Sequence, residues 1–212
     1  MTPADQGDYF ANHARARRLP WSIYHRPLEA DLARFLGGLP AGAHVLVIGC
    51  GLLHELDRAP SGVTFTVADI DGRAVAAVLD RQDPRVVGGV VVAPDRPIDA
   101  YLTGLDAIYA KEVVEHVVPP QPWLDGCARA LAPGGRLWLS TPHYGVPYLA
   151  ALEATVLEWV ARRDGFSRRD LHPSRYSPAR LRRGLAAAGL VDVDVRATWH
   201  QLALMATARR PR

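Results

Sequence analysis

The sequence predicts an α/β fold in which a mostly parallel sheet is covered by helices on both faces. Residues 45–48 form a short apolar run, rich in β-branched side chains, that stops at Gly49-Cys50-Gly51. A second run, residues 63–68, stops at Asp69. Continuous apolar runs of this kind are typical of parallel strands buried on both faces. Further along the chain, strand patterns alternate with helix patterns, as expected for parallel strands joined by crossover helices.

The chain before the first strand divides into two parts. Residues 1–25 carry several aromatic and histidine side chains, and we expect them to form an N-terminal arm or a lid. Pro27 opens a helical pattern that places apolar side chains on one face and ends at Gly37-Gly38. We assign residues 26–212 to a single domain, because this length is usual for one hydrophobic core.

The middle of the chain continues the alternation of the two element types. Asp71 is a suitable N-cap for the first helix of this part, because its side chain can accept a hydrogen bond from a backbone amide of the first turn. We expect helices over residues 72–80 and from Pro119-Pro120 onward, and strands over residues 85–92, 106–110 and 136–142.

The C-terminal part contributes two more helices and two strands. Periodicity predicts a helix over residues 148–161 and a second one over residues 179–188, with a polar loop between them. Ser177-Pro178 supplies an N-cap and a proline at the first helical position of the second helix. Strands over residues 191–197 and 201–208 are joined by a short turn, so they must pair antiparallel at one edge of the sheet.

The composition of the 212 residues bounds the classes of protein to consider. Hydrophobic residues make up 49% of the chain, which is typical of a globular domain. The net charge is +3, but the basic residues are dispersed arginines, apart from Lys111, so we do not expect a nucleic-acid partner. Two cysteines make a disulfide framework implausible. No signal peptide or membrane-spanning run is visible, and we expect a cytoplasmic protein.

The glycine turn and Asp69 predict a nucleoside ligand. Gly49 and Gly51 allow a tight turn and let a ligand lie close to bare backbone, and an apolar segment compatible with a helix follows them. An acid that lies about 20 residues after such a turn, at the end of the second strand, can accept hydrogen bonds from both ribose hydroxyls.

Several motifs in this order resemble those of class I S-adenosylmethionine-dependent methyltransferases, over roughly residues 25–210. The resemblance implies a Rossmann-like, seven-stranded, mostly parallel sheet with helices on both faces and an antiparallel C-terminal hairpin. It implies S-adenosylmethionine as the cofactor and methyl transfer as the activity. The matching segments are residues 45–51, 67–71, 106–116, 131–137 and 140–143.

The resemblance also assigns parts of the cofactor to particular positions. Two positions depart from the family pattern, since Val47 replaces an acid and Leu53 replaces a third glycine. The glycine turn is expected at the methionine and ribose portion, an acid on the ribose hydroxyls, an apolar side chain on the adenine, and the end of the fourth strand at the sulfonium. In this order the residues are Gly49, Cys50 and Gly51, then Asp69, then Ile70, then Ala110 and Lys111.

The acceptor is expected beside the ends of the fourth and fifth strands, which His116 and His143 follow. A histidine is a suitable base for a hydroxyl acceptor near neutral pH, and His25 and His172 are further candidates. Glu112, Glu115 and His116 are similar to the Glu-x-x-Glu-His motif of small-RNA 2′-O-methyltransferases and some quinone-precursor O-methyltransferases, where it can hold a divalent metal. The motif also occurs in many methyltransferases without a metal, and we expect none here.

The leading functional hypothesis is a methyltransferase that acts on a small-molecule acceptor by O- or N-methylation. The first alternative is an RNA methyltransferase with a metal at the Glu-x-x-Glu-His motif. The second is a catalytically silent protein that binds the cofactor, which the departures at Val47 and Leu53 keep open. The sequence does not distinguish among acceptors or oligomeric states.

Overall fold

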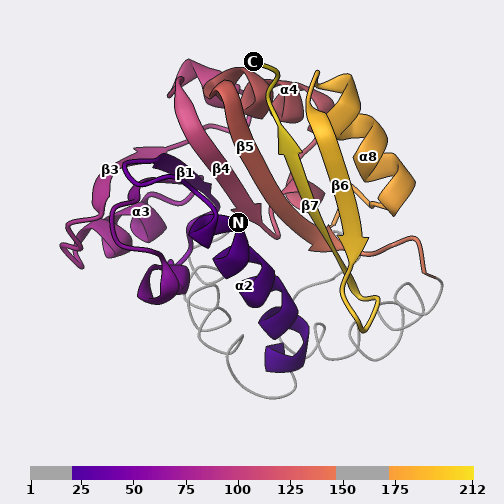
Figure 1. Ribbon diagram of the computed structural model, residues 1–212, viewed down its shortest axis with the longest axis horizontal. Coiled ribbons are helices and arrows are strands. Elements are labelled where there is room, and N and C mark those ends of the chain that lie inside the picture. Colours follow the sequence, from indigo (N-terminus) through magenta and orange to yellow (C-terminus); the bar gives the residue numbers. More distant parts are fainter. Residues whose placement is uncertain (1–20, 147–171) are drawn as a thin grey trace.

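The computed structural model describes residues 21–146 and 172–212, which contain one seven-stranded sheet (Figure 1). The order across the sheet is β3-β2-β1-β4-β5-β7-β6. Strand β7 is antiparallel to β5 and to β6, and the other neighbouring strands are parallel. The strands are β1 (His44–Ile48), β2 (Thr64–Asp69), β3 (Val86–Val91), β4 (Leu105–Lys111), β5 (Leu131–Pro142), β6 (Val191–Ala197) and β7 (Ala203–Arg209).

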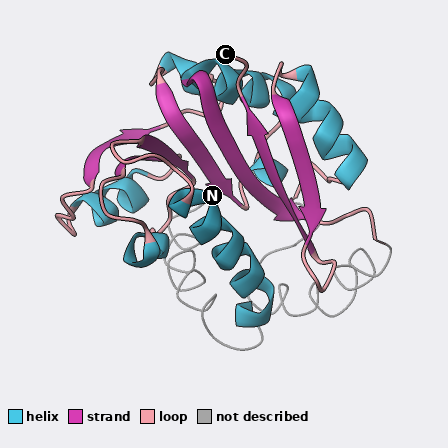
Figure 2. Cartoon of the chain, viewed as in Figure 1, coloured by secondary structure: helices cyan, strands magenta, loops and turns pink. Residues whose placement is uncertain are grey.

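Four α-helices and three short 3-10 helices of the described part connect or cover these strands (Figure 2). The order of strands and helices, with its antiparallel C-terminal pair, confirms the predicted fold class. The α-helices are α2 (Trp21–Gly37), α3 (Gly72–Leu79), α4 (Pro120–Ala130) and α8 (Pro178–Ala187). The 3-10 helices are η1 (His54–Arg58), η2 (Ile98–Ala100) and η3 (Val114–His116).

The sheet separates two hydrophobic cores, one on each face. Successive side chains of a strand point to opposite faces, so Val47 and Tyr109 join one core while Ile48 and Ile108 join the other. Helices α2 and α3 and the segment η1 complete the first core, and α4 and α8 complete the second. The central strands are therefore buried on both sides, as their continuous apolar runs predict.

The structure corrects the predicted start of the first helix. Helix α2 begins at Trp21 and contains Pro27, so the expected boundary between the arm and the domain at residue 25 falls inside a helix. Pro27 is the seventh residue of this helix, so it removes one intrahelical hydrogen bond and its ring crowds the carbonyl of Ile23, four residues earlier. The turn before Pro27 is also anchored from outside, because the Tyr24 hydroxyl donates a hydrogen bond to Glu112.

The segment after the glycine turn also differs from the prediction. It forms only η1, a 3-10 helix of five residues, where the pattern is compatible with a longer helix. Leu53 has a φ of 46° and its side chain is buried. A leucine in the left-handed region interrupts a right-handed helix. At the position where the family has a third glycine, this chain thus has a left-handed residue whose side chain belongs to the core.

The remaining described elements lie close to their predicted positions. Asp71 and Ser177 are N-caps, since their side chains accept hydrogen bonds from the amides of Arg73 and Arg180 at 3.0 Å and 3.3 Å. Strand β5 begins at Leu131, earlier than predicted. The predicted helix over residues 148–161, most of the loop after it and residues 1–20 of the arm lie outside the described residues.

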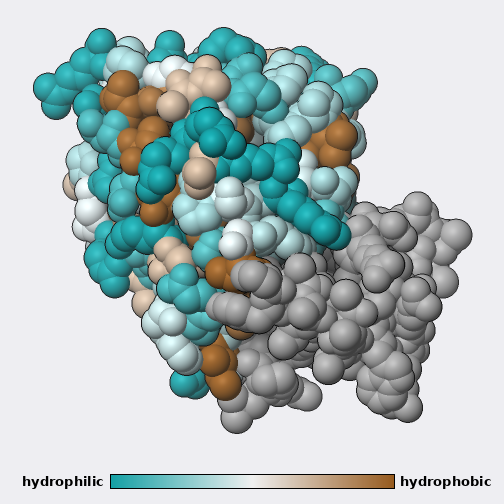
Figure 3. Space-filling view, turned by 90° about the vertical axis from the view of Figure 1, so that its right-hand side faces the viewer, coloured by the Kyte–Doolittle hydropathy of each residue, from teal (hydrophilic) through white to brown (hydrophobic). Residues whose placement is uncertain are grey.

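The carboxyl ends of β4, β5 and β6 point to one end of the molecule, where the β6–β7 turn also lies (Figure 1). On the face drawn in Figure 3, hydrophilic residues predominate over the described part, with hydrophobic residues interspersed among them. Within residues 21–146 and 172–212, no helix combines the length and the apolar character that crossing a membrane requires.

Candidate active site

The glycine turn follows β1 along the chain and is hydrogen bonded to the end of β2. Gly49 and Gly51 have φ values of 70° and 47°, in the left-handed region. The amides of Gly49 and Cys50 both donate to the Ala68 carbonyl, at 2.8 Å and 3.2 Å. A Cβ at Gly49 would lie 2.5 Å from Cγ2 of Val113, so the turn has no room for a side chain there. The left-handed backbone and the contact with Val113 together require a glycine at this position.

Asp69 lies at the carboxyl end of β2 and is buried. One carboxylate oxygen accepts a hydrogen bond from the Gly51 amide at 3.1 Å, and the other accepts one from the Asp71 amide at 3.0 Å. Each carboxylate oxygen has two lone pairs, so both oxygens keep capacity to accept a further hydrogen bond. The next side chain, Ile70, is 68% exposed and offers an apolar surface beside the carboxylate.

Cys50 lies within the turn with its thiol buried. Burial raises the pKa of the Cys50 thiol to about 12, and the nearby Asp69 carboxylate contributes to the shift. The thiol therefore stays protonated near neutral pH, which excludes it as a thiolate nucleophile.

Ala110 and Lys111 end β4, directly beside β1, with Ile48 paired to Ala110. The Lys111 ammonium forms an ion pair with the carboxylate of Glu55 on η1. Burial raises the pKa of Glu55, but the Lys111 ammonium outweighs burial and leaves the pKa below its ordinary value. Glu55 is thus an ionised carboxylate that joins the segment after the glycine turn to the end of β4.

Glu112 is the next residue and receives two side-chain hydrogen bonds. The Tyr24 hydroxyl donates to Oε2 at 2.7 Å, and the Ser140 hydroxyl donates to Oε1 at 2.8 Å. Burial raises the pKa of Glu112 even though both donors favour the ionised form. Tyr24 comes from α2 and its ring is stacked on His200 of the β6–β7 turn, with 5.7 Å between the ring centroids. Glu112 therefore connects β4, β5 and α2.

Glu115, His116 and His172 form a cluster beside Glu112. A carboxylate oxygen and two imidazole nitrogens lie within 4.8 Å of one another. Glu115 is buried, and its Oε2 has no hydrogen-bond partner among the described residues. Burial and the Glu112 carboxylate raise the pKa of Glu115 well above its ordinary value. The His172 ring is hydrogen bonded to the Tyr144 hydroxyl at 2.6 Å, between Nδ1 and the oxygen.

The arrangement of this cluster fits a divalent cation. A buried carboxyl group with one oxygen that lacks a hydrogen-bond partner, next to two imidazoles, is a ligand set that such ions use. Glu112 belongs less to the set than the sequence motif suggests, because both of its oxygens accept hydrogen bonds from Tyr24 and Ser140. His172, which lies far from the motif in the sequence, takes its place in the cluster.

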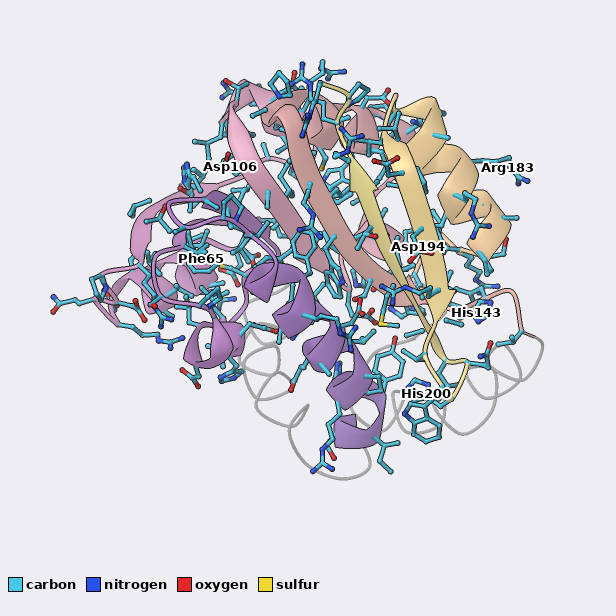
Figure 4. The ribbon with its side chains drawn as sticks, in the orientation of Figure 1. Phe65, Asp106, His143, Arg183, Asp194 and His200 are labelled. Carbon is cyan, nitrogen blue, oxygen red and sulfur yellow. The ribbon has the colours of Figure 1, made fainter. Side chains whose placement is uncertain are left out.

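His143 follows β5 and lies at the same end of the sheet as His200 (Figure 4). Its ring is buried, and Nδ1 lies 3.1 Å from the Gln201 carbonyl oxygen. A Cβ at Gly145 would lie 2.8 Å from Nε2, so the ring occupies the space that a side chain at this position would need. His143 is therefore held tightly, whereas the His116 side chain is 47% exposed.

All seven residues expected at the cofactor lie at the carboxyl ends of β1, β2 and β4, and these parallel strands end at one edge of the sheet. Sequence reasoning missed the contact of Tyr24 with Glu112 and the pairing of Glu55 with Lys111. The second had one signal in the sequence, because Lys111 is the only lysine of the chain. The first had none, since the partners are 88 residues apart.

Comparison with known proteins agrees with this geometry. A family model described as a methyltransferase domain matches residues 20–195, which is most of the chain. The chain therefore belongs to this family, the class I S-adenosylmethionine-dependent methyltransferases, as the Rossmann-like sheet and the glycine turn at its edge also indicate.

Two curated relatives illustrate the similarity in sequence. Ubiquinone biosynthesis O-methyltransferase of Xanthomonas oryzae pv. oryzae is 37% identical over 126 residues, 58% of this chain and 52% of that protein. The protein of the same name from Idiomarina loihiensis is 30% identical over 161 residues, 73% of this chain and 64% of that protein. The chain thus spans only 52% and 64% of these two relatives.

The structural comparison extends over nearly the whole chain. Phosphoethanolamine N-methyltransferase 2 of Haemonchus contortus, solved in complex with S-adenosyl-L-methionine, has a TM-score of 0.65. It is 13% identical, and the alignment covers 94% of this chain and 60% of that one. At this level of identity the comparison establishes the shared fold.

Proposed function

We propose that this chain is an O-methyltransferase that transfers the methyl group of S-adenosylmethionine to a hydroxyl group of a small aromatic acceptor. The observation that carries the proposal is the cluster of titratable side chains beside the edge that holds the glycine turn. The relatives named as ubiquinone biosynthesis O-methyltransferases support an oxygen acceptor on a quinone precursor. The dispersed arginines favour a small acceptor over RNA.

In this proposal the cofactor lies across the carboxyl ends of β1, β2 and β4. The backbone of Gly49, Cys50 and Gly51 lies against its methionine and ribose portions. The free lone pairs of Asp69 accept hydrogen bonds from the ribose hydroxyls, and the exposed Ile70 side chain packs on the adenine. The backbone of Ala110 and Lys111 lines the sulfonium.

The chemical step needs little besides alignment and a base. The acceptor oxygen attacks the methyl carbon in line with the carbon–sulfur bond, the pair of that bond returns to sulfur, and S-adenosylhomocysteine leaves. The hydroxyl proton passes to an imidazole, for which we propose His116 and, as a second candidate, His143. His116 is the more accessible of the two, since its side chain is 47% exposed.

An apolar hollow supports an aromatic acceptor. It has a volume of about 360 Å³ and is lined by Ile23, Arg26, Pro27 and Trp199. Ile23 and Trp199 are chain neighbours of Tyr24 and His200, whose rings stack on one another, and Tyr24 donates to Glu112. The hollow is therefore formed by α2 and the β6–β7 turn, the two elements whose Tyr24 and His200 rings stack.

A metal-dependent version of the reaction is a second candidate, favoured by the buried Glu115 oxygen Oε2 that has no hydrogen-bond partner among the described residues. Glu115, His116 and His172 would hold the ion. A bound divalent cation would lower the pKa of an acceptor hydroxyl and so replace the base. In that case Glu112 would keep its two hydrogen bonds and orient the segment that carries Glu115.

The test begins with binding of S-adenosylhomocysteine by calorimetry and continues with methyl transfer to a panel of phenols and catechols, followed by mass spectrometry. We expect transfer to oxygen. In His116→Ala we expect the rate of transfer to fall by a factor of about 10² or more. Transfer only to carbon or nitrogen acceptors, or no binding of S-adenosylhomocysteine by folded protein, contradicts the proposal. Activity that is lost with a chelator and restored by Mn²⁺ selects the metal-dependent version.

His143→Ala is the companion variant in this test. Because the His143 ring is buried, its removal is expected to lower stability as well, so its rate is compared at a temperature where thermal unfolding shows the variant to be folded. A loss of rate in folded His143→Ala with a normal rate in His116→Ala would assign the base to His143.

A further inference from the structure

The ion pair between Glu55 and Lys111 is the feature of the site that the reaction described above does not use. It connects η1, directly after the glycine turn, with the last residue of β4. Its side chains are only 13% and 26% exposed. Burying two charges costs desolvation free energy, and a pair of this kind is weak evidence for stability. The pair therefore calls for a functional explanation.

The position of the pair is next to the part of the glycine turn expected at the methionine end of the cofactor. Glu55 lies near enough to Cys50 and Tyr109 for its carboxylate to contribute to the raised pKa of each. On the other side, Lys111 follows Ala110, which is paired with the last residue of β1. Both charges thus lie between the turn and the end of β4.

Both members of the pair can form further hydrogen bonds. An ammonium group has three N–H donors, and within the described ranges the only hydrogen bond found for the Lys111 ammonium is the one to Glu55. The two remaining donors suit a carboxylate. The Glu55 carboxylate has more lone pairs than one ammonium can use, and these suit a second cation.

The substitution at Val47 leaves a need for such groups. Val47 occupies the position where the family has an acid, and its side chain is buried in the core. It therefore offers no polar atom to the cofactor. Glu55 restores a carboxylate near the turn, and Lys111 adds a cation beside it.

We propose that Glu55 and Lys111 together bind the amino-acid end of S-adenosylmethionine, which carries an ammonium and a carboxylate group. Lys111 donates to the ligand carboxylate, and Glu55 accepts from the ligand ammonium. A pair of opposite charges meets a second pair of opposite charges, so each charge gains a partner on binding. This inference rests on the proposed function, because it takes S-adenosylmethionine to be the ligand.

The experiment compares two ligands that share the adenosine and differ at this end. S-adenosylhomocysteine has the zwitterionic amino-acid chain, and 5′-methylthioadenosine has a methyl group in its place. Both are titrated by calorimetry into the full chain and into Glu55→Gln and Lys111→Met. We expect each variant to bind S-adenosylhomocysteine about 10- to 100-fold more weakly and 5′-methylthioadenosine within about 3-fold of the unchanged protein.

Asp99→Asn provides the matched control. It removes one charge from another ion pair, the one with Arg129, which joins η2 to α4 on the other face of the sheet. We expect it to bind both ligands as the unchanged protein does. Retained affinity for 5′-methylthioadenosine also shows that Glu55→Gln and Lys111→Met are folded around the adenosine portion.

Each other outcome has one meaning. Unchanged affinity of both variants for S-adenosylhomocysteine overturns the inference and leaves the proposed function in place. An equal loss for the two ligands overturns it as well, because the pair would then only hold η1 against β4. Failure of the unchanged protein to bind either ligand contradicts the proposed function itself.

Discussion

Asp69 is a buried side chain that shapes the glycine turn and that we propose to bind the ribose of the cofactor. Its carboxylate accepts hydrogen bonds from the Gly51 and Asp71 amides, so it fixes the glycine turn and the start of α3. Its place after an apolar strand was readable from the sequence. Its two backbone partners were not, because they depend on how the turn closes over the end of β2.

Replacing Asp69 by Asn is predicted to weaken binding of S-adenosylhomocysteine by about 10- to 100-fold, since hydrogen bonds to a charged acceptor contribute about 1.5–3 kcal/mol. Calorimetric titration measures the change. Asp71→Asn is the control, because Asp71 lies two residues away but caps α3 and is paired with Arg73 at the surface. Equal affinities of Asp69→Asn and the unchanged protein would exclude Asp69 from the ligand site.

At the scale of elements, the turn between β1 and η1 decides the shape of the site. Gly49 has both a left-handed backbone and a neighbour, Val113, that leaves no room for a Cβ. Leu53, four residues later, is also left-handed and sends its side chain into the core. The sequence pattern indicated the first of these turns, but a leucine carries no signal for a left-handed conformation.

Gly49→Ala is predicted to destabilise the protein by about 2–4 kcal/mol, which combines the left-handed backbone cost of about 1–2 kcal/mol with the overpacking against Val113. Urea unfolding measures the change. Gly49→Ala combined with Val113→Ala removes the overpacking, so its loss relative to Val113→Ala alone is expected to fall to about 1–2 kcal/mol. A full loss in the double variant would show that Val113 is not the obstacle.

At the scale of the molecule, Asp31 holds α2 against the sheet. Its Oδ2 accepts a hydrogen bond from the Trp138 indole of β5 at 3.0 Å, and its Oδ1 is bonded to Arg34 of α2 and Arg196 of β6. Because α2 also carries Tyr24, this network determines where the Tyr24 hydroxyl meets Glu112. Packing of a helix thus positions a group of the site.

Asp31→Ala is predicted to cost about 1–3 kcal/mol of stability, because it leaves the buried Trp138 indole N–H without its acceptor. Chemical unfolding followed by tryptophan fluorescence measures the loss. Arg34→Ala removes a partner whose side chain is 70% exposed, and its expected cost is below about 1 kcal/mol. Similar losses for the two variants would mean that the bond to Trp138 contributes little.

Local signals in the sequence predict the order and type of the main elements. Apolar runs, glycines and the acid after the second strand are local signals, and they were sufficient for the sheet and for its antiparallel end. The assignment of seven residues to the cofactor stays a prediction, and the structure places these residues at the carboxyl ends of β1, β2 and β4. Strand patterning is a local consequence of burial on both faces, which is why the order of elements was predictable.

Contacts between distant side chains needed the folded chain. Glu55 of η1 meets Lys111 at the end of β4. His172 joins Glu115 and His116, and its segment is hydrogen bonded to the Glu115 backbone through Ser174. Tyr24 reaches Glu112 because Asp31 anchors α2. The residues of each pair are far apart in the sequence, and no periodic pattern of the sequence indicates that they meet. Their meeting depends on the packing of whole elements, so the chemistry at the edge of the sheet became visible only in three dimensions.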